Sequence, residues 1–117
     1  MDFELARQAH NEWKIKLRTA IAKQEHLDAA SISSDNRCQL GEWLHGEAKV
    51  KYGRLASYAD CVSKHTAFHQ EAGKVAQTIN LKNYAQAKTM MDANTPYALA
   101  ANAFIIAMGV LKKEAGL

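Results

Sequence analysis

Apolar residues recur every three or four positions along most of this chain, and that spacing predicts amphipathic helices rather than strands. The clearest example lies near the amino terminus, where one helical face carries Phe3, Ala6, Trp13, Leu17 and Ala20, widened by Ile21. The same pattern predicts five helices, over about residues 3–24, 36–51, 56–80, 82–93 and 96–113. Runs of alternating β-branched residues are absent. The predicted fold class is therefore all-α.

The breaks between these helices have recognisable sequences. Residues 31–36, SISSDN, predict a loop that ends in helix-capping residues, and residues 52–55, YGRL, predict a turn. Thr95 is a predicted N-cap, and Pro96 suits the first position of a helix. We therefore expect a four-helix-bundle-like fold whose last helical layer is broken near Pro96. A length of 117 residues predicts one domain over residues 1–117.

Composition narrows the class of protein further. Hydrophobic residues make up 48% of the chain and charged residues 23%, which is typical of a globular protein. The 15 Lys and Arg are interspersed with 12 Asp and Glu, giving a net charge of +3 without a basic stripe. We therefore expect no nucleic-acid partner.

Residues 97–111, YALAANAFIIAMGVL, form the most apolar stretch. This stretch is about five residues too short to span a bilayer, and it contains Asn102. A helix buried in the bundle or against a partner is expected instead. The amino-terminal sequence is not that of a signal peptide, and the two cysteines do not suggest a disulfide framework. We expect a cytoplasmic protein without a membrane partner.

Four potential metal ligands lie on predicted inner faces or near a helix start. His65 and His69 are an i, i+4 pair on the inward stripe of residues 56–80, and His10 lies on the stripe of the first helix. Cys38 stands near the start of another helix, where the helix dipole favours the thiolate. Three imidazoles and one thiolate suit zinc, although satisfied core histidines would give the same spacing.

Hydrolysis does not fit this donor set. A zinc protease carries a glutamate directly after its first histidine, and this chain has Thr66 at that position. Four protein ligands also leave no place for an activated water. We therefore expect no enzyme activity. Cys61, one turn before His65, remains open as a thiolate ligand, whereas His26 and His45 are expected to have no metal role. Trp13 and Trp43 are expected to pack in the core and to keep water off the metal.

Three motifs in order resemble those of the chemoreceptor zinc-binding (CZB) domain family. They are HNEW at residues 10–13, CQLGEW at residues 38–43 and HTAFH at residues 65–69. The second motif is the most specific, and the resemblance extends from His10 to the last helix. It implies a cytoplasmic helical bundle that binds one zinc ion per chain. It also implies the ligands, which are His10, Cys38, His65 and His69.

The resemblance further implies a sensory role in bacterial signalling. Such domains are attached to chemoreceptors and diguanylate cyclases, often as dimers, and respond to zinc or to oxidants such as hypochlorous acid. A homodimer and an attached or partner signalling domain are therefore expected, because this chain has no output signature of its own. Two alternatives remain at this point. One is an iron-containing oxygen-binding or redox bundle, and the other is a purely structural interaction module.

Overall fold

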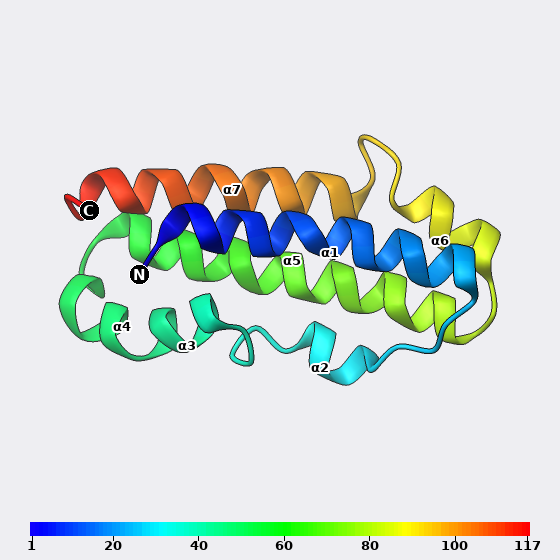
Figure 1. Ribbon diagram of the computed structural model, residues 1–117. Helices are drawn as coiled ribbons and strands as arrows, with labels where there is room; N and C mark the ends of the chain where they lie inside the picture. Colours follow the sequence, from blue (N-terminus) through cyan, green and yellow to red (C-terminus); the bar gives the residue numbers. More distant parts are fainter.

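The chain forms a bundle of helices without strands, as seen in a computed structural model that describes all residues 1–117 (Figure 1). Three long helices, α1, α5 and α7, lie side by side along the molecule, which measures 43 × 25 × 20 Å. The short helices α2, α3 and α4 form the fourth layer. The helices are α1 (Phe3–Lys23), α2 (Ala29–Ser33), α3 (Gln39–His45), α4 (Glu47–Tyr52), α5 (Ala56–Asn80), α6 (Tyr84–Met90) and α7 (Pro96–Glu114). The all-α, bundle-like prediction is confirmed, with the break before Pro96.

Local capping sets the ends of the long helices. The Asp2 carboxylate accepts two backbone N–H groups of the first turn of α1, and Gln24 ends that helix with a left-handed φ of 56°. The Thr95 hydroxyl accepts the Ala98 N–H at 3.4 Å, and Pro96 follows at the first position of α7. The predicted N-cap and the predicted proline position are therefore both confirmed.

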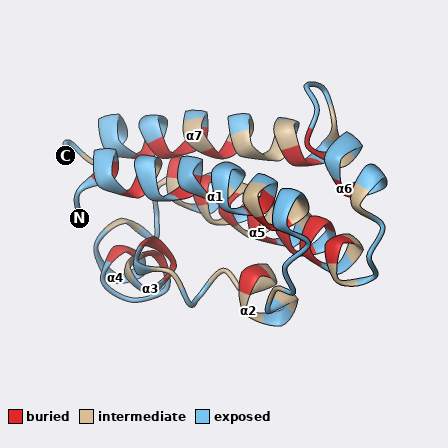
Figure 2. Cartoon of the chain, turned by 45° about the vertical axis from the view of Figure 1, so that its right-hand side comes forward, coloured by how far each residue is buried: buried red, intermediate tan, exposed pale blue.

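The inner faces of the helices meet in one core of 21 buried apolar residues (Figure 2). Helix α5 is central to it, and α2 crosses α5 closely at Gly73. A Cβ atom at Gly73 would lie 2.6 Å from the Ser33 Cβ, so the crossing requires glycine. The Asn80 side chain, at the end of α5, hydrogen-bonds both the N–H and the carbonyl of Leu27, which lies just before α2. The fourth layer is thus fixed to α5 by direct contacts. None of the helices has the length and apolar character needed to span a membrane.

Two predictions for the fourth layer were wrong. Residues 31–36 were predicted as a loop, but α2 occupies the first part of this segment, with Asp28 as its N-cap. Serine side chains compete with helical hydrogen bonds, and contact with α5 overrides that preference. Residues 36–51 were predicted as one helix, but the chain bends at Gly46 (φ −111°, ψ −103°) into α3 and α4.

Candidate metal centre

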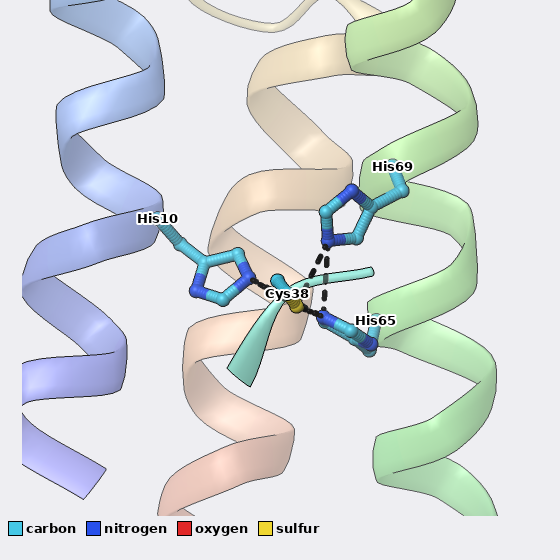
Figure 3. A group of neighbouring side chains, drawn as sticks. All are labelled: His10, Cys38, His65 and His69. Carbon is cyan, nitrogen blue, oxygen red and sulfur yellow. Dashed lines mark hydrogen bonds between the residues drawn. The ribbon is translucent and has the colours of Figure 1, made fainter. Parts of the chain in front are cut away.

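Four side chains from three places in the bundle meet at one point (Figure 3). His10 comes from α1, His65 and His69 come from α5, and Cys38 is the N-cap residue of α3. One potential ligand atom from each lies within 4.8 Å of all the others. The structure therefore brings together the four residues that the family resemblance implied.

Five of the six separations between the donor atoms are close to those around a small tetrahedral ion, and the sixth, between His10 and His69, lies within 4.8 Å. The Nε2 atom of His65 lies 3.3 Å from that of His10 and 3.1 Å from that of His69. The Cys38 sulfur lies 3.7, 3.3 and 3.6 Å from the Nε2 atoms of His10, His65 and His69. Ordinary Zn–N and Zn–S bond lengths at tetrahedral angles give N···N of about 3.3 Å and N···S of about 3.6 Å. The arrangement thus has the dimensions of a zinc site.

Backbone carbonyls orient two of the three imidazoles. The Nδ1–H of His10 donates to the Ala6 carbonyl at 2.7 Å, and the Nδ1–H of His69 donates to the Ile32 carbonyl at 2.9 Å. Each bond places the proton on Nδ1, so the Nε2 lone pair points into the site. The third ring, that of His65, has a buried Nδ1 with no hydrogen-bond partner and is held by packing.

Burial keeps all three imidazoles neutral. His10, His65 and His69 are 5%, 0% and 3% exposed. Desolvation lowers the pKa of each ring, and for His65, beside two further histidines, the pKa falls to about 3. The Nε2 lone pairs of His10 and His69 both point into the site, and a cation there would accept both of them. The histidines are therefore already in the protonation state that a metal requires.

Cys38 is the least buried of the four. Its sulfur accepts the Gly41 N–H at 3.3 Å. Burial nevertheless raises the pKa of the Cys38 thiol, because desolvation outweighs the backbone N–H groups that stabilise the thiolate. The N–H groups at the helix start favour the thiolate, as expected, but the larger effect of desolvation leaves the pKa raised. α3 has only seven residues, and its N–H groups do not compensate for the lost water. A metal ion would supply the missing positive charge.

Phenylalanines, rather than tryptophans, surround the imidazoles. The Phe104 ring centroid lies 4.9 Å from that of His10 and 5.1 Å from that of His65, and the Phe68 ring contacts His10 and His69. Trp43 packs instead against Phe3 and Tyr52, so its predicted role beside the metal is not seen. Sequence reasoning missed both phenylalanines, although Phe68 lies inside the HTAFH motif.

A cleft of about 670 Å³ opens beside the site. Cys38 and His69 are among the residues that line it, together with the apolar side chains of Trp13, Leu27 and Ile32. Trp13 therefore lines the approach to the sulfur rather than packing wholly in the core. The cleft gives small solutes a way to reach the sulfur side of the site.

The remaining cysteine and histidines lie outside the four-residue group. Cys61 is fully buried, and desolvation raises its pKa to about 12. His26 is exposed, and His45 lies on the surface at the end of α3, where it contacts Asp35. No carboxylate is among the four donors, whereas a di-iron bundle needs several.

Comparison with protein-family models supports the same interpretation. The model described as the chemoreceptor zinc-binding domain matches residues 10–76, which include all four side chains of the site. The match ends within α5, so α6 and α7 lie outside it. Neither the curated proteins nor the solved structures gave a match. The matched segment is more than half of the chain, and the protein therefore belongs to the chemoreceptor zinc-binding domain family.

Proposed function

We propose that this chain binds one zinc ion through His10, Cys38, His65 and His69. The convergence of three Nε2 atoms and one sulfur at tetrahedral spacing carries the proposal. The donor set is borderline-soft, as zinc prefers, and it needs only the Cys38 proton to leave. A zinc ion held there would supply the charge that keeps the thiolate ionised. It would also link α1, α5 and the start of α3, so metal binding would contribute to folding.

The proposed role is sensory and regulatory, not catalytic. Four protein donors close the coordination sphere and leave no position for a reactive water. Membership of the family supports a place in bacterial signalling. We propose that residues 1–117 act as one cytoplasmic domain, attached to or working with a chemoreceptor or a diguanylate cyclase. Chemotaxis or cyclic-di-GMP control would then be the output.

The proposed signals are zinc itself, oxidants such as hypochlorous acid, or both. Cys38 is only partly buried and lines the cleft, so solutes can approach its sulfur. Oxidation of the sulfur to a sulfenic acid weakens its donation to a metal. Loss of the metal or of the thiolate would release the start of α3 from α1 and α5. Both inputs therefore act on the same segment.

We further propose a homodimer. Leu99, Ile106 and Val110 of α7 are 56%, 68% and 50% exposed, and their spacing places them on one face of the helix. These positions fall within about 40° around the helix axis. An apolar face of this kind is stabilised when a second copy covers it.

Metal content tests the zinc site directly. The purified protein, handled without chelator, is compared with Cys38→Ser and Cys61→Ser by inductively coupled plasma mass spectrometry and absorption. We expect about one zinc per chain, reduced in Cys38→Ser and unchanged in Cys61→Ser. Loss in Cys61→Ser would move the sulfur ligand to α5. Stoichiometric iron with visible absorption would favour a redox bundle, and absence of metal would leave only a structural module.

A further inference from the structure

Asp35 connects the two segments that carry Cys38 and His65. Its Oδ2 atom accepts the Thr66 hydroxyl at 2.6 Å, and Nε2 of His45 lies 3.1 Å from the same oxygen. Thr66 follows His65 directly on α5, and Asp35 precedes Cys38 by three residues. The contact therefore joins the Cys38 turn to α5 without using any of the four donor atoms.

The backbone of Asp35 is packed against the same turn. Its carbonyl oxygen would lie 1.7 Å from a Cβ at Gly41, and it is 3.8 Å from the Cys38 sulfur. The Gly41 N–H in turn donates to that sulfur. Asp35, Gly41 and the sulfur thus form one compact unit, and a movement of Asp35 moves the sulfur with it.

The bond to Thr66 is a strong one by type and length. A hydroxyl that donates to a carboxylate at 2.6 Å is a short, charge-assisted hydrogen bond. The single Thr66 proton has one alternative acceptor, the Val62 carbonyl at 2.9 Å, and the anion is the better acceptor. The Asp35 side chain is only 20% exposed, so water competes weakly.

We propose that Asp35 and Thr66 form a latch that positions the Cys38 sulfur and slows release of the metal, which rests on the zinc site proposed above. A single broken metal–sulfur contact leaves the latched sulfur beside the three imidazoles, where it rebinds. Once the latch opens, Asp35 is no longer tied to α5, and the segment that carries Asp35 and the Cys38 sulfur moves more freely at the start of α3. Thr66, which replaces the glutamate of zinc proteases, thus has a positioning role in this chain.

The far end of α3 has its own attachment to α5. The Tyr58 hydroxyl donates to the Leu44 carbonyl at 2.7 Å, and Leu40 and Leu44 are buried. Opening the latch therefore frees the Cys38 end while α3 stays docked. A variant without the latch is expected to fold.

The test compares Thr66→Val, which removes the hydroxyl, with Thr66→Ser, which keeps it. Thr78→Val is the matched control, because the Thr78 hydroxyl on the same helix bonds only the Lys74 carbonyl. Zinc-loaded proteins are mixed with an excess of a colorimetric chelator, and the rate of zinc release is recorded. Thr66→Val should release zinc about 10–100-fold faster, as for other partners that support metal ligands. Thr66→Ser and Thr78→Val should stay near wild type.

A second measurement needs no metal. In chelator-treated protein, alkylation of Cys38 by iodoacetamide should be faster in Thr66→Val than in wild type, and buried Cys61 provides the internal reference. Unchanged alkylation and unchanged zinc release in Thr66→Val would overturn the latch, as would a Thr66→Ser variant as fast as Thr66→Val. A wild type that binds no zinc but shows faster Cys38 alkylation in Thr66→Val would refute the zinc site and retain the latch's positioning role.

Discussion

Cys38 and Cys61 differ mainly in what surrounds their sulfur atoms. Cys38 is half-buried and lines the cleft, whereas Cys61 is 0% exposed within the core. Burial raises the pKa of both thiols, and that of Cys61 reaches about 12. A cysteine reacts when solutes can reach its sulfur and when its thiol is ionised to the thiolate. Of the two sulfur atoms, only that of Cys38 can be reached by solutes.

We therefore predict that a disulfide reagent titrates one thiol in the native, metal-free protein at pH 8 and two thiols in denaturant. Cys38→Ser should abolish the native reaction, and Cys61→Ser should leave it intact. Added zinc should protect Cys38. The measurement is the absorbance of the released thiolate. Reaction of both thiols in the native protein would show that Cys61 is accessible and that the core around it opens readily.

For single residues, the potential metal ligands could be predicted from the sequence, but the residues that surround and position them could not. Helical spacing indicated the pair His65 and His69, whereas the family resemblance was needed to single out His10 and Cys38 among the residues that meet in space. Asp35 and Phe104 gave no signal, because a lone aspartate in a polar segment and a phenylalanine in an apolar helix are common. Their importance arises from contacts between residues far apart in sequence, such as Asp35 with Thr66. Local patterns do not record such contacts.

Among the helices, α3 can pack against the turn that precedes it only because residue 41 is a glycine. A Cβ at Gly41 would lie 1.7 Å from the Asp35 carbonyl oxygen, whereas a Cβ at Gly109 of α7 would meet nothing within 4 Å. An alanine at position 41 must therefore displace the turn that carries Cys38. An alanine at position 109 only removes the flexibility of a glycine within a helix.

We predict that Gly41→Ala lowers the free energy of unfolding by about 1–3 kcal/mol and weakens zinc binding. The control Gly109→Ala should raise it by about 0.5–1 kcal/mol and leave zinc binding unchanged. Urea unfolding and competitive zinc titration give the two quantities. Equal effects of the two substitutions would mean that the contact between Asp35 and Gly41 is not tight in solution.

Long helices were predictable at this scale and short ones were not. The predicted range of residues 56–80 equals α5, and residues 96–113 differ from α7 by one residue. Helix α2 was missed because its five residues include two serines, and its position depends on α5. Gly73 permits the close approach of Ser33, and His69 bonds the Ile32 carbonyl. Tertiary contact, rather than sequence preference, stabilises this helix.

For the whole molecule, three neutral histidines in the core make the metal-free fold sensitive to acid. Desolvation lowers the folded-state pKa of all three, that of His65 from 6.5 to about 3. The unfolded chain therefore binds more protons than the folded chain below pH 6.5. Stability is fully present above that pH and is lost as the pH falls toward the folded pKa values.

We predict that the metal-free protein loses stability steadily between pH 7 and pH 4. Urea midpoints followed by circular dichroism in the presence of chelator measure this loss. His65→Phe removes the largest of the three shifts and should flatten the slope, even if it changes the stability at pH 7. A slope equal to that of wild type would show that carboxylates, not His65, dominate the acid response.

The outer face of α7 gives a last prediction, which concerns assembly. Ile106 is 68% exposed between Leu99 and Val110 on one face, whereas Val50 on α4 is 88% exposed without such neighbours. If this face forms the proposed homodimer, sedimentation should give twice the chain mass of 12.9 kDa for wild type and for Val50→Glu. Ile106→Glu should give the monomer mass, because the interface would then bury an unpaired carboxylate. A monomeric wild type, or dissociation by Val50→Glu alone, would place the interface elsewhere or remove it.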